Sequence, residues 1–317
     1  MRFHALLPVR DEADIVGQCL AHLLLWADAI YVFDTGSVDA TWDIVQDYAH
    51  RDARVIALRR DAVYFSETRL RGWMFEQARR EMQHGDWFLR VDADEFHHIA
   101  PPTFVKERMR PGETIAYHQY YDFQLLESEA AAWEHEKEPL TDRARPIEER
   151  RRWFVPSVYS EPRLCRYRST MQWPPTVSFP HNAGLVARAR LPIRHYPHRD
   201  PAQLARRCRL RAIMMADSEN RSNWSRPELH HWAESDWRRF VAPDGREDLR
   251  YWAPGTALPE FAFENHLARG PKRLLQRLVH SHLLPFLDSR RQRWPADAYP
   301  QRIPDQISAL LSDELRI

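Results

Sequence analysis

Two closely spaced carboxylates follow an apolar run in the first third of the chain. The run is Trp87-Phe88-Leu89-Arg90-Val91, and Asp92-Ala93-Asp94-Glu95 comes directly after it. Carboxylate oxygens are ligands that Mg2+ and Mn2+ prefer, and such a cation neutralises the charge of a diphosphate. A solvated turn or a helix cap has the same composition. The pair alone therefore does not indicate a metal site, and the segments around it have to be considered.

Strands alternate with helices through the first hundred residues. Short apolar runs predict strands at 3–9, 29–33, 54–58 and 87–91, and apolar residues at helical spacing predict helices over about 15–24, 40–49 and 67–84. This order predicts an α/β fold with a mostly parallel sheet flanked by helices. Ligands of such sheets lie at the carboxyl ends of the strands.

Polar clusters follow three of these strands, at 8–12, 34–37 and 92–95. Because the carboxyl ends of parallel strands meet at one edge of a sheet, we expect the clusters to form one site. There Asp34 can accept hydrogen bonds from a ribose or a base, and Gly36 allows close approach of the backbone. The alternative is that Asp34 and Asp39 only order the turn.

The segment Asp34-Thr35-Gly36-Ser37 also occurs in the active-site loops of aspartic proteases. Those enzymes need two carboxylates that share a proton, but the chain has no second Asp-Thr-Gly or Asp-Ser-Gly motif. A helix is also expected from about residue 40, where a protease lobe would continue in strands. These two observations disfavour a protease.

The three clusters resemble, in order and spacing, the motifs of the family-2-like glycosyltransferases with the GT-A fold. The matching segments are 7–12, 32–41 and 85–95, and the resemblance is strong over residues 1–115. The family usually has Asn-Glu where this chain has Asp11-Glu12. The resemblance implies a Rossmann-like GT-A core and a metal-dependent, inverting transfer of a sugar from a nucleotide diphosphate donor to a saccharide, glycolipid or other hydroxyl acceptor.

The resemblance also implies roles for individual residues. Asp92 and Asp94 would act with Mn2+ or Mg2+. Arg69 or Arg71 would add a cationic contact to the phosphate, and a solvated helix face is the alternative for either. The residues implied to border the nucleotide are Pro8, Glu12, Asp34, Thr35, Ser37 and Asp92.

A histidine follows the last expected core strand, in Arg194-His195-Tyr196-Pro197-His198-Arg199. Because related enzymes complete the metal shell with a distal histidine, the resemblance implies that His195 is the third protein ligand, with His198 or Arg199 facing the diphosphate. His181 is a rival ligand, and a structural role is the alternative for each histidine.

An inverting transfer needs a carboxylate that takes a proton from the acceptor hydroxyl. The candidates, in order, are Asp122, Glu127 and Glu161, and each has a structural or exposed role as its alternative. A retaining transfer need not use such a base.

The second part of the chain is less regular. Strands are expected at 114–123, 162–167 and 184–194, a helix at 201–217, and an exposed helix or mobile insertion over the charged segment 127–152. We expect two units, a catalytic domain over 1–217 and a mainly helical region over 218–317 that shapes the acceptor site. Stacking on sugar rings or burial in the core are the alternatives for the aromatic residues Trp133, Trp153, Tyr159, Trp173 and Trp224.

A basic, partly amphipathic helix is expected over 272–291, interrupted at Pro285. It would rest on an anionic membrane surface near a lipid-linked acceptor, or else pack on the catalytic domain.

The composition is that of a globular protein. Lys and Arg number 46 against 45 Asp and Glu, and the resulting net charge of +1 disfavours nucleic-acid binding. The cysteines Cys19, Cys165 and Cys208 are too few and too far apart for a disulfide framework, which favours the cytoplasm. We expect no signal peptide and no membrane span, because no run reaches about eighteen apolar residues.

These observations predict a cytoplasmic glycosyltransferase, with polysaccharide biosynthesis as a plausible setting. Two alternatives stay open. A nucleotidyltransferase acting on sugar phosphates would need a Gly- and Lys/Arg-rich loop after its first strand, whereas 8–12 is acidic and has no glycine. A non-catalytic carbohydrate-binding protein could retain the same fold.

Overall fold

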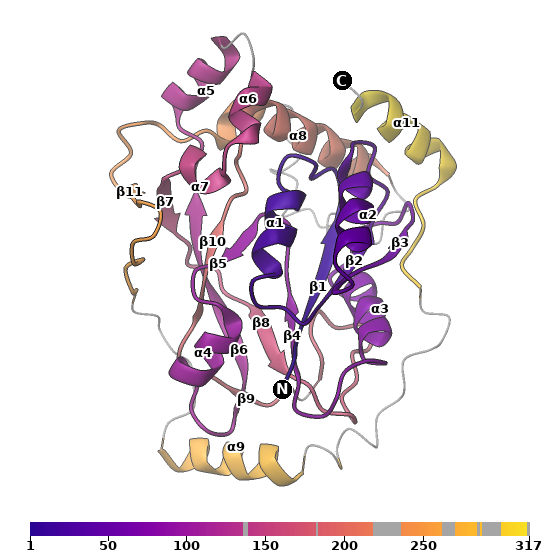
Figure 1. Cartoon of the computed structure of the whole chain (residues 1–317), viewed down its shortest axis with the longest axis vertical. Helices are drawn as coiled ribbons and strands as arrows, with labels where there is room; N and C mark the ends of the chain where they lie inside the picture. The colour runs from indigo at the N-terminus through magenta and orange to yellow at the C-terminus, as the bar shows by residue number, and fades with distance from the viewer. Residues whose placement is uncertain are drawn as a thin grey trace.

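The computed structural model describes residues 1–135, 139–181, 183–217, 236–261, 270–283, 286 and 299–315. Within them, one curled sheet of eleven strands is flanked by helices (Figure 1). Its main path has the order β11-β7-β6-β8-β4-β1-β2-β3, while β10 pairs with β5 and β6, and β9 pairs with β6. The predicted α/β fold is confirmed.

The first half of the chain forms the parallel part of the sheet, in which β1 lies between β2 and β4 and β2 pairs with β3. The strands are β1 (Phe3–Val9), β2 (Ala29–Asp34), β3 (Val55–Arg60) and β4 (Trp87–Arg90). The helices between them are α1 (Val16–Leu23), α2 (Thr41–Arg51) and α3 (Arg69–Ala78). All seven elements lie where the apolar pattern predicts them, although α3 is shorter than expected.

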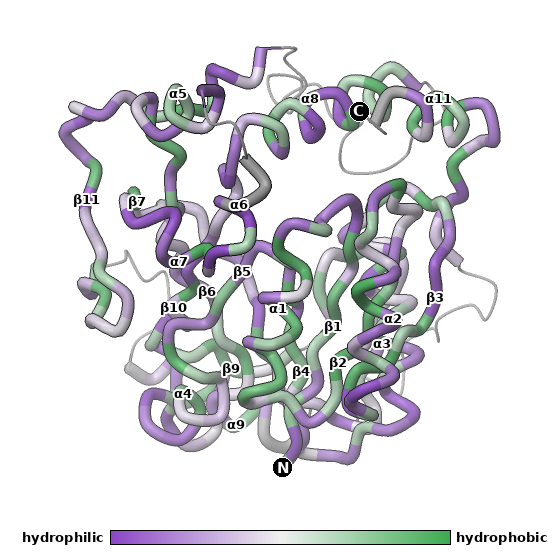
Figure 2. The backbone as a smooth tube through the Cα atoms, turned by 45° about the horizontal axis from the view of Figure 1, so that its top comes forward, coloured by the Kyte–Doolittle hydropathy of each residue, from purple (hydrophilic) through white to green (hydrophobic). Residues whose placement is uncertain are grey.

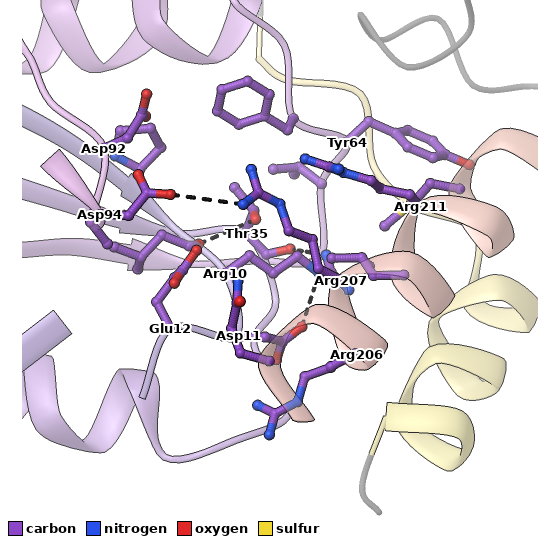
Figure 3. A pocket seen from close by; sticks show the side chains of 18 of the residues that line it. Arg10, Asp11, Glu12, Thr35, Tyr64, Asp92, Asp94, Arg206, Arg207 and Arg211 are labelled. Atoms are coloured by element: carbon purple, nitrogen blue, oxygen red, sulfur yellow. Dashed lines mark hydrogen bonds and ion pairs between the residues drawn. The ribbon is translucent and has the colours of Figure 1, made fainter. Parts of the chain in front are cut away.

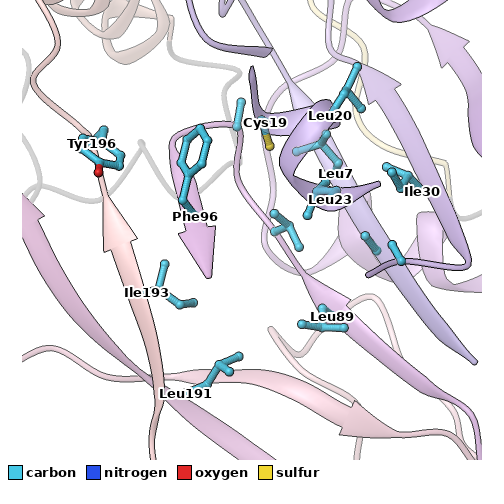
Figure 4. Close-up of a cluster of buried hydrophobic side chains, with 14 of the residues drawn as sticks. Leu7, Cys19, Leu20, Leu23, Ile30, Leu89, Phe96, Leu191, Ile193 and Tyr196 are labelled. Atoms are coloured by element: carbon cyan, nitrogen blue, oxygen red, sulfur yellow. The ribbon is translucent and has the colours of Figure 1, made fainter. Parts of the chain in front are cut away.

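Two buried apolar clusters cover the two faces of this sheet. Along β1, Ala5 and Leu7 belong to one cluster with residues of α1, whereas Leu6 belongs to the other with residues of α3. This alternation follows from the two-residue period of a strand. Hydrophobic segments accordingly run along the central strands in Figure 2, and Figure 4 shows the α1 side of the core.

Antiparallel pairing begins beyond β4, so the whole sheet is mixed rather than mostly parallel. The strands of this part are β5 (Glu95–His97), β6 (Glu113–Phe123), β7 (Trp153–Pro156), β8 (Pro162–Arg166), β9 (Leu185–Val186), β10 (Leu191–His195) and β11 (Arg250–Tyr251). Its helices are α4 (Pro101–Arg108), α5 (Glu127–His135), α6 (Pro139–Ala144), α7 (Ile147–Arg150), α8 (Pro201–Ala216), the 3-10 helix Trp237–Phe240, α9 (Gly270–His282) and α11 (Asp305–Leu315).

The charged segment 127–152 differs from its prediction as one exposed helix or a mobile insertion. Its described residues, 127–135 and 139–152, form three short helices, and Ile147, Arg150 and Arg151 are buried. Of the aromatic candidates, Trp173 is fully buried in the core, and Trp224 lies outside the described residues. The helix expected over 272–291 is described as α9, and most positions beyond it lie outside the described residues.

The described end of the chain packs against the first part. Tyr64, Met214, Ile303 and Leu311 form a small apolar cluster that joins α11, α8 and the loop after β3. The division into units at residue 217 stays a prediction.

Candidate active site

The loops after β1 and β2 are held together by hydrogen bonds. The backbone N–H of Asp11 donates to Ser37 Oγ at 2.9 Å, and the N–H of Val38 donates to Asp11 Oδ1 at 2.8 Å. The N–H of Glu12 donates to Thr41 Oγ1 at 2.8 Å. Asp11 has a φ of 53°, which an aspartate tolerates better than most residues. Two of the three predicted clusters therefore meet in one rigid rim.

Asp34 orders the second loop. Its Oδ1 accepts the N–H groups of Gly36 at 2.8 Å and Ser37 at 2.6 Å, while Oδ2 is buried without a hydrogen-bond partner among the described residues. Burial raises the pKa of Asp34. Gly36 has a φ of 99°. Only Thr35 of this loop lines the neighbouring cavity, so direct contacts of Asp34 and Ser37 with a nucleotide stay predictions.

A cavity of about 310 Å3 lies between this rim and α8 (Figure 3). One wall carries the carboxylates, the opposite wall carries arginines of α8, and one region is apolar. The lining residues are Pro8, Val9, Arg10, Asp11, Glu12, Thr35, Val63, Tyr64, Phe65, Glu67, Asp92, Ala93, Asp94, Gln203, Arg206, Arg207, Leu210, Arg211 and Met214.

Asp94 and His195 come together at the edge of this cavity. The register of β10 between β5 and β6 places His195 opposite both Glu95 and Asp122. His195 Nε2 is 3.6 Å from Asp94 Oδ2, and its Nδ1 is 2.7 Å from Asp122 Oδ1. Burial opposes a charge on His195, but Asp94 and Asp122 outweigh it and raise the pKa of His195 to about 10. The predicted pair of Asp94 and His195 is thus assembled.

Asp92 is engaged by arginines. Its Oδ1 is 2.6 Å from Arg71 Nη2, and its Oδ2 is 3.3 Å from Arg163 Nη2. Arg71 is fully buried, and it also pairs with Glu67 at 2.9 Å. Arg69 is exposed. Neither Arg69 nor Arg71 lines the cavity, so a contact of either with the phosphate stays a prediction.

The predicted metal ligands do not form one three-residue set. In the described ranges, no group of three or more His, Cys, Asp or Glu side chains is arranged to hold a metal ion. Asp94 and His195 fit as two donors, since Mg2+ keeps several waters and is bound through one or two carboxylates plus phosphates. Each Asp92 oxygen pairs with one guanidinium group, so a contact of Asp92 with the metal stays a prediction.

Arg199 is the buried cation behind the carboxylate wall. It forms an ion pair with Glu12, lies 2.6 Å from Asp14 Oδ2 through Nε, and lies 3.8 Å from Asp94 Oδ2 through Nη1. Burial opposes its charge, but Asp14 and Glu12 outweigh it and hold the pKa of Arg199 above its ordinary value. Arg199 therefore holds the acidic wall in place.

The arginines of α8 were not predicted as site residues. Arg206 pairs with Asp39 at 2.8 Å, and Arg207 Nη1 donates to the Pro197 carbonyl at 2.7 Å and lies 4.0 Å from Asp94 Oδ2. Burial, and next the charge of Arg207, lowers the pKa of Arg211. The sequence does indicate which residues share one face of this helix, because they recur at positions i, i+4, i+7, i+8 and i+11. These residues line the cavity, and they are Gln203, Arg207, Leu210, Arg211 and Met214.

The three base candidates lie in different surroundings. Asp122 contacts His195, whereas Glu127 is exposed at the start of α5. Glu161 pairs with Arg90 and Arg163, at 3.1 Å each. None of the three lines the cavity. Asp122 is joined to Asp94 through His195, whereas Glu161 is joined to Asp92 through Arg163.

The other two candidate histidines, His198 and His181, do not line the cavity. His198 packs beside Phe240 with ring centroids 5.7 Å apart, and burial lowers the pKa of His198 to about 3. His181 follows β8 in a loop.

Solved structures show only low similarity to this chain. A mannosyltransferase from Pyrobaculum calidifontis in complex with GDP-Man and Mn2+ is 14% identical over 73% of this chain and 69% of that one, with a TM-score of 0.38. The mannosyl-3-phosphoglycerate synthase of Rubrobacter xylanophilus is 19% identical over 52% and 53%, with a TM-score of 0.29. The glucosyl-3-phosphoglycerate synthase of Mycobacterium tuberculosis is 16% identical over 52% and 56%, with a TM-score of 0.24.

No curated protein matches the chain. Residues 5–171 match the family model described as glycosyl transferase family 2, which is more than half of the chain and includes all three predicted motifs. The chain therefore belongs to glycosyltransferase family 2.

Proposed function

We propose that this glycosyltransferase binds a nucleoside diphosphate sugar in the cavity beneath α8 and transfers the sugar to a hydroxyl of a saccharide or lipid-linked acceptor. The observation that carries the proposal is the opposition of charge across the cavity. Asp94 lies on one wall, and Arg207 and Arg211 lie on the other (Figure 3). A diphosphate that bridges a cation to guanidinium groups satisfies both walls.

Asp94 and His195 are the residues that would hold Mn2+ or Mg2+. Bound there, the metal would neutralise the charge that develops on the departing diphosphate. Asp122 orients the His195 ring through Nδ1. Asp92 lines the cavity beside them, so its contact with the nucleotide remains part of the proposal.

Arg207 and Arg211 are the residues that we propose as the cationic contact to the diphosphate. The charge of Arg71 is balanced by Asp92 and Glu67. The guanidinium groups of Arg207 and Arg211 lie one turn apart on α8 at the cavity wall, where both would contact the diphosphate.

The apolar region of the cavity suits the nucleoside. Tyr64 and Phe65 follow β3, and Leu210 and Met214 lie on α8. An aromatic base can pack on such side chains while the ribose reaches Thr35. The nucleoside would thus lie at one end of the diphosphate and the sugar at the other.

Inverting transfer is the proposed mechanism. The acceptor oxygen attacks the anomeric carbon, the bond from that carbon to the diphosphate oxygen breaks, and a carboxylate takes the proton of the acceptor hydroxyl. Asp122 is the candidate whose position suits a base best. Its side chain is 28% exposed, and His195 contacts both Asp122 and Asp94.

A membrane contact is proposed for α9, which lies at the opposite end of the molecule from α8 (Figure 1). Arg273 faces the protein and pairs with Glu113 at 3.0 Å, whereas Leu274, Leu275 and Leu278 are 60%, 61% and 51% exposed. With Lys272 also exposed, this face presents leucines and a cation to an anionic lipid surface. No helix in the described part of the chain is long and apolar enough to cross a membrane.

The donor site is tested by thermal unfolding with UDP, GDP, ADP and dTDP, each with Mn2+ and with EDTA. At least one nucleotide should raise Tm by several degrees with Mn2+, and EDTA should remove most of the rise. Asp94→Asn should lose the response, whereas Asp43→Asn on α2 should keep it. A panel without any Tm response would contradict the donor site.

Turnover distinguishes the remaining classes of function. A nucleoside diphosphate released from a nucleotide sugar supports a glycosyltransferase. Pyrophosphate released from a nucleoside triphosphate and a sugar phosphate would instead show a nucleotidyltransferase.

A further inference from the structure

A second cavity, of about 480 Å3, lies where α5, α6 and α7 meet β7 and β11. It shares no lining residue with the cavity beneath α8. Its walls carry three aromatic side chains and charges of both signs. The lining residues are Glu129, Ala132, Trp133, Asp142, Arg145, Glu149, Arg150, Arg151, Arg152, Trp153 and Tyr251.

The aromatic side chains of this cavity are only partly covered by protein. Trp153 is 37% exposed and Tyr251 is 52% exposed, and their ring centroids lie 5.2 Å apart at 67°. Trp133 is partly buried, and its Nε1 has no hydrogen-bond partner among the described residues. Packing in the core therefore does not account for Trp153 and Tyr251.

The polar side chains of the cavity are held in place by one another. Arg150 Nε is 2.8 Å from Asp142 Oδ2, and Arg151 Nη1 is 3.7 Å from Glu129 Oε2. Arg152 Nη1 donates to the Tyr251 hydroxyl at 3.0 Å. Donors and acceptors are thus fixed close to the aromatic rings.

This combination selects a neutral, polyhydroxylated ligand. Four arginines of the lining are opposed by the carboxylates of Glu129, Asp142 and Glu149, with which three of them form ion pairs, so the cavity has little net charge to hold a strong anion. A purely apolar ligand would leave the charged groups desolvated. A pyranose ring has one face of C–H groups that packs on an aromatic ring, and its hydroxyls bond to carboxylates and guanidinium groups. A cavity of a few hundred Å3 is of the usual size for such a ligand.

We propose that this second cavity binds a saccharide, which belongs to the acceptor. The acceptor role rests on the proposed function, but the binding itself does not.

One residue connects the two cavities. Arg150 Nη2 and Arg151 Nη2 donate to the Arg199 carbonyl, and the Arg199 guanidinium pairs with Glu12 and Asp14 on the side of the first cavity. An acceptor of several sugar units that is anchored at Trp153 would be held beside the donor site.

The inference is tested by fluorescence titration of the full chain with cellobiose, α-1,2-mannobiose and chitobiose, without a nucleotide. At least one disaccharide should bind, and Trp153→Ala or Tyr251→Ala should raise its Kd at least tenfold. Trp153→Phe should retain most of the affinity. The matched control is Tyr159→Ala, since Tyr159 is 56% exposed and lies outside this cavity.

The outcomes separate this inference from the proposed function. Nucleotide binding by Trp153→Ala shows that the variant is folded, so a selective loss of disaccharide binding supports the second cavity. If the wild-type protein binds none of the three disaccharides, or if Trp153→Ala binds them as the wild type does, the inference is overturned while the donor site stands. Disaccharide binding at Trp153 without any nucleotide response would support the cavity and contradict the proposed function.

Discussion

Asp122 and His195 lie opposite each other on the neighbouring parallel strands β6 and β10, with Asp122 Oδ1 2.7 Å from His195 Nδ1. A carboxylate that accepts the Nδ1 proton fixes the orientation of the ring, so a metal that binds Nε2 would have to displace the proton that Asp94 helps to hold there. Nε2 is the atom that faces Asp94, at 3.6 Å. The strand register thus sets the orientation of the proposed metal ligand.

Asp122→Asn should weaken Mn2+ binding about 10- to 100-fold, because loss of such an orienting carboxylate has an effect of this size. Titration of Mn2+ followed by electron paramagnetic resonance measures it, and Glu127→Gln is the control that should leave the affinity unchanged. Unchanged Mn2+ affinity would contradict the orienting role of Asp122, and lost turnover in the same variant would then support its proposed role as the base.

Arg207→Ala should raise the Kd for a nucleoside diphosphate at least tenfold, which is about 1.4 kcal/mol, because a charge-assisted contact is lost. Isothermal titration calorimetry measures the change, and Arg207→Lys should recover part of it. Arg209→Ala is the matched control, since Arg209 lies on the same helix but does not line the cavity. An equal loss in both alanine variants would contradict the assignment of Arg207.

Gly36→Ala should destabilise the protein by about 2 kcal/mol or more, because Gly36 has a φ of 99° and an added Cβ would lie 2.9 Å from Ala62 Cα. The control is Gly17→Ala in α1, where the nearest atom would be 3.6 Å away. That variant should gain about 0.5–1 kcal/mol from helix propensity. Urea unfolding compares the two variants, and equal stabilities would be the contrary result.

Stability should fall as the pH drops below about 6.5, partly through His22. Burial, and next Arg194, lowers the pKa of His22 to about 4, and its Nε2 accepts the backbone N–H of His97 at 2.9 Å. Since the unfolded histidine titrates near 6.5, the unfolded state binds more protons between these values. The contribution is full above pH 6.5 and is lost as the pH falls toward 4.

His22→Gln keeps the acceptor and removes this titration. Between pH 6.5 and 5, the free energy of unfolding of the variant should fall less steeply than that of the wild type, by up to about 1.4 kcal/mol per pH unit. Urea unfolding at several pH values measures both slopes. Identical slopes would show that His22 does not contribute.

The double substitution Leu274→Gln and Leu275→Gln should reduce binding to vesicles that contain phosphatidylglycerol. Binding of the wild type should weaken with added salt, because part of the attraction is electrostatic. Leu310→Gln on α11 is the control, since Leu310 is 42% exposed on another helix. Vesicle sedimentation measures binding, and equal binding by the double variant would rule out α9 as the contact.

The parallel half of the fold could be predicted because its signals are local. Alternating apolar runs mark β1 to β4, and each of the three polar clusters directly follows a strand, which is sufficient to predict that Asp94 lies on the site rim. The pairing of Asp92 with Arg71 and Arg163 could not be predicted, because it depends on how α3 and β8 pack around one carboxylate.

The role of α8 was missed for a similar physical reason. Its arginines occur on several faces, and only packing of the helix over the rim determines which of them enter the cavity. Trp173 and Trp153 illustrate the same limit, since one is fully buried and the other lines a cavity although both are tryptophans in irregular regions of the sequence.

The ion pairs of Arg199 with Glu12 and Asp14 span 187 and 185 residues of the chain. During synthesis the amino-terminal strands leave the ribosome long before this arginine, so Glu12 and Asp14 stay hydrated and lack this ion-pair partner until residue 199 is made. Contacts of such high sequence separation form late and slow folding. A nascent chain arrested before residue 199 would therefore have most strands of the sheet but no closed donor cavity, and nucleotide binding would report the completion of folding.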